Sequence, residues 1–230
     1  DMVSFWKKLV LGRHARVCYS QCGEDLIADS VFLNLGIRTP SYLDIGAHDP
    51  VYLSNTYYFY RKGGRGVCVE PDPVLHERIR KKRPRDICLN AGIGAEGTEK
   101  APFYCMSSST LNTCSREDAE RYAGYGKEKI VKVLEIPLLP VNDVIGKHFP
   151  SCPNFVSLDA EGLDMSILET FDFSRFRPQV FVIETLTYTE DNSERKEQDI
   201  IRHMESVGYM TYADTYVNTL FVDRAAWQSR

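Results

Sequence analysis

Short apolar runs alternate with longer amphipathic stretches along this chain. The short runs predict buried strands at Tyr42–Ile45, Gly66–Glu70, Asp86–Asn90, Phe155–Leu158 and Gln179–Glu184. Helical spacing is clear from Glu24 to Leu35, where Ile27, Val31 and Leu35 share one face. Further helices are predicted near Asn55–Arg61, Pro73–Lys81, Ser115–Tyr122, Val141–Gly146, Asp164–Thr170 and Asn192–Ser206. This alternation predicts a parallel sheet with helices on both faces.

Two more segments, Lys100–Met106 and Val131–Pro137, have a strand-like composition. The final strands, Tyr209–Tyr212 and Tyr216–Val222, have no helix between them, so they can only pair antiparallel. The predicted fold class is α/β, with a Rossmann-like, doubly wound, mostly parallel seven-stranded sheet and an antiparallel last strand. No repeat or linker divides the chain, so we expect one domain over residues 1–230, with 1–18 as an N-terminal helical extension.

Composition and charge narrow the range of partners. The net charge is -4 and there is no basic tract, which argues against a nucleic-acid partner. No apolar run is long enough to span a bilayer, and lysines interrupt the apolar start of the chain, so we expect no stable membrane insertion. The seven cysteines are odd in number and two of them, Cys68 and Cys88, lie in apolar strand patterns. This usage predicts reduced thiols and a cytoplasmic location.

The most informative stretch of the sequence runs from Tyr42 to Pro73. A predicted strand ends in Asp44 and Gly46, and the next predicted strand ends in Glu70. In open parallel sheets a glycine at the first position lets a ligand approach the backbone, and an acid at the second accepts hydrogen bonds from ribose hydroxyls. The separation of Gly46 and Glu70 is close to the roughly twenty residues typical of this unit. The pattern therefore predicts a site for a nucleoside cofactor.

Five predicted strands end in polar side chains, which indicates a lined pocket at one edge of the sheet. These residues are Asp44, Glu70, Asn90, Asp159 and Glu184. A complete G-x-G-x-x-G dinucleotide motif is absent, because Ala47, His48 and Asp49 follow Gly46. Its absence argues against a nicotinamide-dependent oxidoreductase.

Eight motifs in order resemble the FkbM family of S-adenosylmethionine-dependent methyltransferases from about Tyr19 to Val222. They read Y-S-Q-C-G-E-D, L-D-I-G-A-H-D-P, L-S-N-T-Y-Y-F-Y, V-E-P-D-P, R-P-R-D-I-C-L-N-A-G-I-G, S-S-T-L-N-T, L-D-A-E-G-L-D and V-I-E-T. The predicted sheet is also the usual frame of class I methyltransferases. The resemblance implies O-methylation of a hydroxyl on a sugar, polysaccharide or related natural product, with S-adenosyl-L-methionine as the methyl donor.

The resemblance also implies which residues contact the cofactor. Gly46 and Ala47 would pass beneath its methionine part, and Glu70 would hold the ribose, with Pro71 and Asp72 close by. The complete set expected to bind the cofactor is Gln21, Glu24, Asp44, Gly46, Ala47, Glu70, Pro71, Asp72, Asn90, Ala91, Gly92 and Asp159.

A sugar hydroxyl is a poor nucleophile at neutral pH, so methyl transfer to it benefits from a general base. The catalytic candidates are Asp159, Glu161 and His48, and Glu184 is a further carboxylate at a strand end. A divalent metal such as Mg2+ is the alternative, with Asp159, Glu161 and Glu184 as its oxygen ligands.

The acceptor end of the site is the least determined part of the sequence. Residues expected to bind the acceptor are Asn55, Tyr57, Ser108, Ser109 and Glu184, and the polar loop 107–112 is expected to act as a lid or an acceptor wall. The expected partner is a small-molecule or glycan acceptor, and the oligomeric state, including a homodimer, stays open. Two alternatives also stay open: N-methylation of an amine on a small metabolite, and a nucleotide-binding domain without catalysis.

Overall fold

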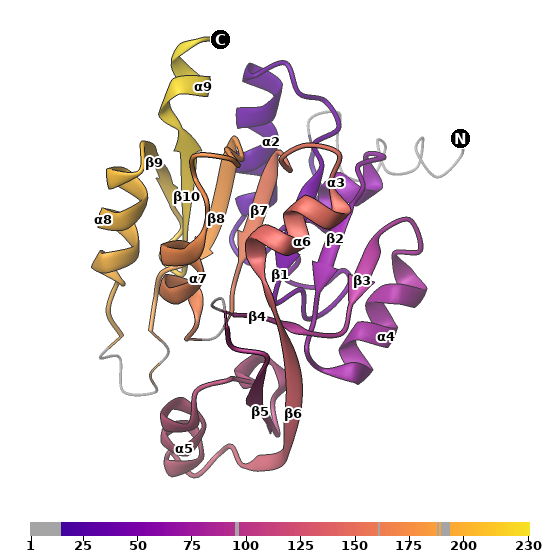
Figure 1. Cartoon of the computed structure of the whole chain (residues 1–230), viewed down its shortest axis with the longest axis vertical. Helices are drawn as coiled ribbons and strands as arrows, with labels where there is room; N and C mark the ends of the chain where they lie inside the picture. Colours follow the sequence, from indigo (N-terminus) through magenta and orange to yellow (C-terminus); the bar gives the residue numbers. More distant parts are fainter. Residues whose placement is uncertain (1–14, 95–96, 161, 188, 190–193) are drawn as a thin grey trace.

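A computed structural model of the chain describes residues 15–94, 97–160, 162–187, 189 and 194–230. Its centre is a seven-stranded sheet in the order β3-β2-β1-β7-β8-β10-β9 (Figure 1). In that order the strands are Ile87–Leu89, Gly66–Val69, Tyr42–Ile45, Phe155–Leu158, Val180–Glu184, Asn218–Asp223 and Tyr209–Asp214. The first five are parallel, whereas β10 runs antiparallel to both β8 and β9. The predicted sheet and its antiparallel end are confirmed.

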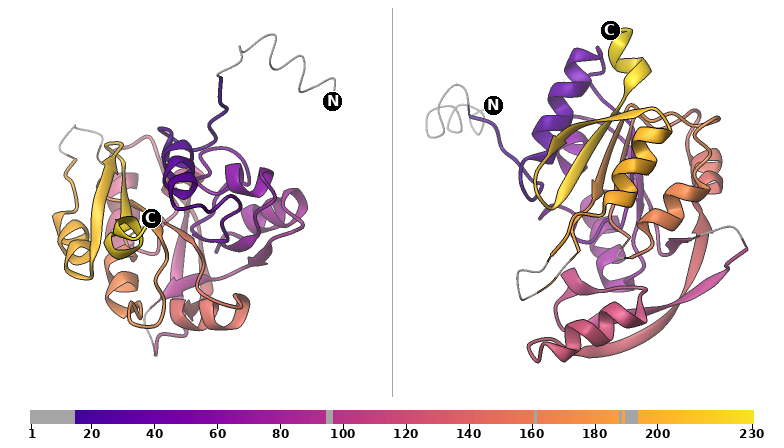
Figure 2. Two further views of the ribbon diagram at one scale, coloured as in Figure 1. Left: turned by 90° about the horizontal axis from the view of Figure 1, so that it is seen from above. Right: turned by 90° about the vertical axis from the view of Figure 1, so that its left-hand side faces the viewer.

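Helices cover both faces of the sheet because side chains alternate along its strands. On β1, Leu43 and Ile45 pack toward α6 (Val141–His148), α7 (Asp164–Thr170) and α8 (Gln198–Ser206). The intervening Tyr42 packs toward α2 (Glu24–Asn34) and α3 (Tyr57–Arg61) on the other face. The views in Figure 2 show the same two helical layers.

The helix α4 (Pro73–Lys82) begins where the sequence predicts, for a visible local reason. Asp72 accepts hydrogen bonds from the backbone amides of Val74 at 2.7 Å and Leu75 at 3.2 Å. Pro73 occupies the first helical turn, where the missing amide hydrogen costs nothing. On the face that α4 covers, Ile79 packs with Cys68 and Ala47.

A second, three-stranded sheet lies beyond the carboxyl-terminal edge of the main sheet (Figure 1). It contains β4 (Gly92–Gly94), β6 (Ile130–Pro140) and β5 (Lys100–Met106). The short 3-10 helix η1 (Ser109–Leu111) and the helix α5 (Arg116–Gly124) connect β5 to β6. We refer to residues 100–130, with β5, η1 and α5, as the cap.

Some boundaries differ from the predictions. The strand β4 and the terminal helix α9 (Arg224–Gln228) are not predicted from the sequence, since each is very short. The helix expected from Asn192 begins at Gln198, and most of the predicted N-terminal extension lies outside the described residues. All seven cysteines are free. Among the described residues, no helix combines the length and the apolar character needed to cross a membrane.

Candidate functional site

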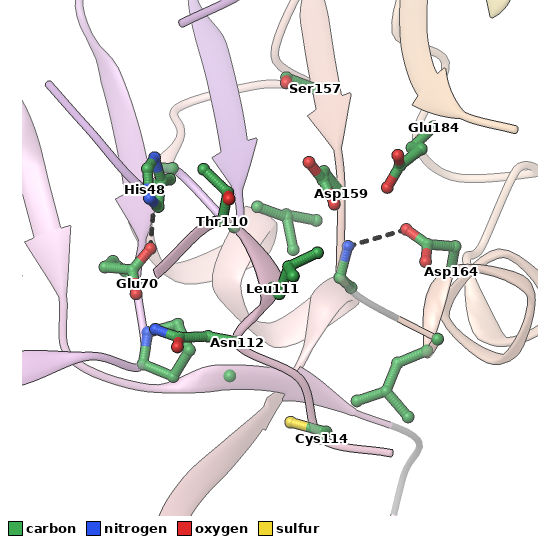
Figure 3. Close-up of a pocket in the computed structure, with 18 of the residues that line it drawn as sticks. His48, Glu70, Thr110, Leu111, Asn112, Cys114, Ser157, Asp159, Asp164 and Glu184 are labelled. Carbon is green, nitrogen blue, oxygen red and sulfur yellow. Dashed lines mark hydrogen bonds between the residues drawn. The ribbon is translucent and has the colours of Figure 1, made fainter. Parts of the chain in front are cut away.

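A pocket of about 810 Å3 opens at the carboxyl-terminal edge of the main sheet. The strand order reverses between β1 and β7, and in open α/β sheets this switch point is where ligands bind. Residues from the ends of β1, β2, β7 and β8 form its floor, and the cap forms an outer wall (Figure 3). The tertiary structure therefore places the predicted strand-end acids around one cavity.

Many of the predicted site residues line this pocket. They are Gln21, Asp44, Gly46, Ala47, His48, Asn55, Glu70, Pro71, Ala91, Gly92, Ser109, Asp159 and Glu184.

Asp44 lines the pocket, but its carboxylate is held by protein groups. It accepts a hydrogen bond from the Thr56 hydroxyl, and the Arg83 guanidinium lies 3.6 Å away. Burial raises the pKa of Asp44, while Arg83, Thr56 and Ser157 act in the opposite direction. Asp44 therefore joins β1, the following loop and β7 at the base of the site.

Arg83 is a residue that the sequence analysis missed. It stands in the basic run R-K-K-R-P-R, which resembles an exposed helix end, yet its side chain is 0% exposed. Its Nε donates to Asp86 at 2.8 Å, and its Nη2 donates to the Thr56 hydroxyl at 2.8 Å. A buried guanidinium with two carboxylate neighbours thus lies beneath the pocket. Nothing in the sequence around Asp86 indicates that this acid forms a buried ion pair with Arg83.

Gly46 is required by the packing of the protein itself. Its φ is +73°, and a Cβ built on it would lie 1.8 Å from the backbone oxygen of Asp159. From the sequence alone, this glycine is expected to let a ligand approach the backbone. The structure gives another reason, the close contact between the chain segments that follow β1 and β7.

Glu70 presents its carboxylate at the end of β2. The backbone amides of His48 and Asp72 each donate to it at 2.8 Å, one to each oxygen. The residue is only 4% exposed, and burial raises its pKa to about 7. Two donors leave lone pairs on both oxygens for further hydrogen bonds. Glu70 is therefore a preoriented acceptor in the pocket wall.

A group of carboxylates faces the pocket on the opposite side of the switch point, at the ends of β7 and β8 (Figure 3). Burial, with the negative charge of Asp164, raises the pKa of Asp159 to about 7, while a hydrogen bond with Glu184 lowers it. The Oδ1 atom of Asp159 is buried and has no hydrogen-bond partner. Asp164 accepts from the backbone amide of Ala160 at 2.8 Å, so it also fixes the turn after β7.

The cap contacts the segment that follows β1 across the pocket. His48 Nε2 lies 3.0 Å from the hydroxyl of Ser109, and burial lowers the pKa of this histidine. Arg121 and Asp118 from α5 also line the pocket and form an ion pair at 2.5 Å. The polar loop 107–112 therefore does form a wall of the pocket, through Ser109, Thr110, Leu111 and Asn112.

Several predicted site residues do not line the pocket, because their polar groups are used elsewhere. Glu24 is fully buried and accepts from Thr215 at 2.6 Å and from Asn218 at 3.1 Å, which ties α2 to the last strands. Asp72 caps α4. The amide of Asn90 donates to the backbone oxygens of Glu70 and Pro71.

Two residues expected at the acceptor end also lie away from the pocket. Tyr57 packs edge-on against Tyr19 and stacks on Tyr60 in an aromatic group beside α3. The backbone amide of Ser108 donates to Glu128, and its hydroxyl lies 2.9 Å from that of Thr110. Glu161, a predicted catalytic residue and metal ligand, lies outside the described residues.

The alternative of a metal site gains no support. In the part of the chain that the structure describes, no three His, Cys, Asp or Glu side chains are arranged to hold a metal ion.

Comparison with known proteins identifies the family. The model of the methyltransferase FkbM domain matches residues 44–210, more than half of the chain. No curated protein is similar enough to the chain to count as a match.

Solved structures similar to the chain include a TehB-like SAM-dependent methyltransferase from Corynebacterium glutamicum, with 11% identity, 96% of each chain covered and a TM-score of 0.45. An O-methyltransferase from Bacillus cereus in complex with SAH has 13% identity and a TM-score of 0.44, over 96% of this chain and 88% of that one. The 16S rRNA N2 G1207 methyltransferase of T. thermophilus has 12% identity and a TM-score of 0.48, over 92% of this chain and 44% of that one. At these identities the similarity carries no information on the substrate.

Proposed function

This chain belongs to the FkbM methyltransferase family, and from that premise we propose that it methylates a hydroxyl oxygen of a sugar, polysaccharide or related natural product, with S-adenosylmethionine as the donor. One observation carries the proposal. Glu70 and the pair Asp159–Glu184 flank the same switch-point pocket from opposite sides. The Glu70 carboxylate can accept hydrogen bonds from the hydroxyls of a ribose. The Asp159–Glu184 pair can bind an acceptor hydroxyl that must lose its proton.

The donor side of the pocket fits this cofactor. Glu70 lines the cavity and keeps lone pairs on both oxygens, to which the two hydroxyls of a ribose would donate. The pocket volume of about 810 Å3 lies in the range of cofactor sites. A carboxylate-rich wall suits a cationic sulfonium, and the bound cofactor would supply an activated methyl group.

The acceptor side of the pocket contains a base with a suitable pKa. A general base works best when its pKa lies near the operating pH, and that of Asp159 is raised to about 7. Asp159 would hold the acceptor hydroxyl and accept its proton, and Glu184, the neighbouring carboxyl at the end of β8, would help to orient it. His48 is the competing candidate, but its Nε2 faces Ser109 in the cap.

The seven free cysteines support a reducing compartment, and we propose the cytoplasm as the location.

The proposal is tested by calorimetric titration with S-adenosylhomocysteine, with and without magnesium, and with NADH as a control ligand. We expect micromolar binding of the homocysteine compound that magnesium does not change. The Glu70→Ala variant should lose at least about tenfold in affinity, because two ribose hydroxyls lose their acceptor. Asp72→Ala is the matched control, since it removes a neighbouring carboxylate that lies outside the pocket. Binding of NADH alone would refute the assignment of the donor.

A further inference from the structure

The cap packs around a small apolar cluster of its own. The buried members of this cluster are Met106, Ala119 and Tyr122, and Tyr104, Leu111, Ala123 and Tyr125 pack against them. Among the described residues, none of these belongs to the apolar clusters of the main sheet. The packing that holds the cap together is therefore separate from the packing that holds the sheet and its helices. An element of this kind opens at a low cost in free energy, because its own core stays intact.

The cap also covers the pocket in which we place the cofactor. Phe103 of β5, Thr110 of η1 and Asp118 of α5 line this pocket together with Glu70 of the main sheet. On the far side α5 approaches the loop after β7, since a Cβ built on Gly162 would lie 3.3 Å from Oδ2 of Asp118. A ligand bound between the sheet and the cap would contact both, so its exchange requires the cap to move.

His48 connects the two sides of the pocket. Its Nε2 atom lies 3.0 Å from the hydroxyl of Ser109 in the cap. Its backbone amide donates to Glu70 at 2.8 Å (Figure 3). The φ of His48 is +48°, a left-handed conformation that is uncommon for residues with a Cβ. The carboxylate that we expect to hold the ribose therefore also fixes the backbone of the residue that contacts the cap.

We propose that His48 is a positioning residue, which holds the cap closed over the cofactor through its contact with Ser109. This contact breaks each time S-adenosylmethionine enters the pocket or S-adenosylhomocysteine leaves it. The inference rests on the proposed function, since it concerns the cofactor of the same pocket. It also removes His48 from the candidates for the general base, because the imidazole nitrogen that could accept a proton faces the cap.

A contact of this kind controls rates rather than affinity. The His48–Ser109 contact joins two protein groups, so it stabilises the closed cap equally with the pocket empty and with the pocket filled. An interaction that is the same in both states cancels in the dissociation constant. It still adds to the barrier for opening, through which both association and dissociation pass.

The contact can be removed from either side. Ser109→Ala deletes the hydroxyl. His48→Asn shortens the side chain, while asparagine tolerates the left-handed backbone and keeps the amide that donates to Glu70. In either variant we expect the association and dissociation rate constants of S-adenosylhomocysteine, measured by surface plasmon resonance, to rise together by about fivefold, the effect of one net hydrogen bond. The Kd should stay within about twofold of the parent value.

Two further variants serve as controls. The double variant should be no faster than either single variant, because both changes remove the same contact. Ser108→Ala should leave both rate constants unchanged, since the hydroxyl of Ser108 lies 2.9 Å from that of Thr110 within the cap and Ser108 does not line the pocket.

The outcomes distinguish the two proposals. If S-adenosylhomocysteine does not bind to the parent chain, the proposed function fails, and this inference fails with it. If it binds but Ser109→Ala leaves both rate constants unchanged, only the inference is overturned. A higher Kd with an unchanged association rate would also overturn the inference, because the substituted residue would then contact the cofactor directly. Equal acceleration in Ser108→Ala would overturn it as well, since any loosening of the loop would then have the same effect.

Discussion

Replacing Arg83 with methionine would remove a positive charge that is buried beneath the pocket. Its side chain is 0% exposed and contacts two carboxylates, Asp86 at 2.8 Å and Asp44 at 3.6 Å. It also donates to Thr56. Methionine fills most of the volume but leaves Asp44 and Asp86 as buried acids without a counter-charge. The loss of stability in this variant therefore reports mainly the missing charge and less the missing packing.

The expected loss of stability follows from the cost of an uncompensated buried charge. Breaking a buried ion pair by removing one partner costs about 3–5 kcal/mol. Since a chain of this size loses about 2–4 °C of melting temperature per kcal/mol, Arg83→Met should melt roughly 6–20 °C lower. The urea midpoint should fall with an unchanged m-value. The deficit should shrink at acid pH, because the two orphaned carboxylates take up protons in the folded variant.

The matched control is Arg80→Met, one helical turn earlier on α4. Arg80 forms an ion pair with Glu77 at 2.7 Å, but both side chains are largely exposed. Exposed pairs contribute about 1 kcal/mol or less, so this variant should melt within a few degrees of the parent. If Arg83→Met lost no more stability than Arg80→Met, the buried charges beneath the site would not stabilise the fold, contrary to this expectation.

Three further outcomes are expected. Gly46→Ala should lower the free energy of unfolding in urea by about 3 kcal/mol more than Gly36→Ala does. Both glycines have a left-handed φ, but only at Gly46 would the new Cβ lie 1.8 Å from a backbone atom. Folding raises the pKa of Glu70 from 4.5 to about 7, so the folded protein binds more protons and the ligand-free protein should lose stability as the pH rises through that window. In thermal melts, Glu70→Gln should lose less stability over the same pH range. An unchanged dependence of melting temperature on pH would contradict the raised pKa of Glu70. Asp159→Asn should lower turnover by about 100-fold or more and abolish the rise of turnover with pH near 7, with little change in S-adenosylhomocysteine affinity. If turnover and this affinity fell equally, Asp159 would be a binding residue.

The sequence by itself determined the fold class and the edge of the sheet that holds the site. Apolar runs and helical spacing are local properties, so the strands β1, β7 and the helix α7 were predicted at their observed bounds. The acids Glu70, Asp159 and Glu184 were found because parallel strands end at a common edge, which places strand-end residues together whatever the details of packing.

Only the tertiary structure decided which polar residues face the cavity and which serve the framework. Glu24 and Asn90 look like site residues in the sequence, yet hydrogen bonds to distant strands and turns occupy them. Arg83 looks like an exposed helix end, yet it is buried between Asp44 and Asp86. Burial and partner choice depend on contacts between segments far apart in the chain, whereas a sequence pattern reports only the preferences of neighbouring residues.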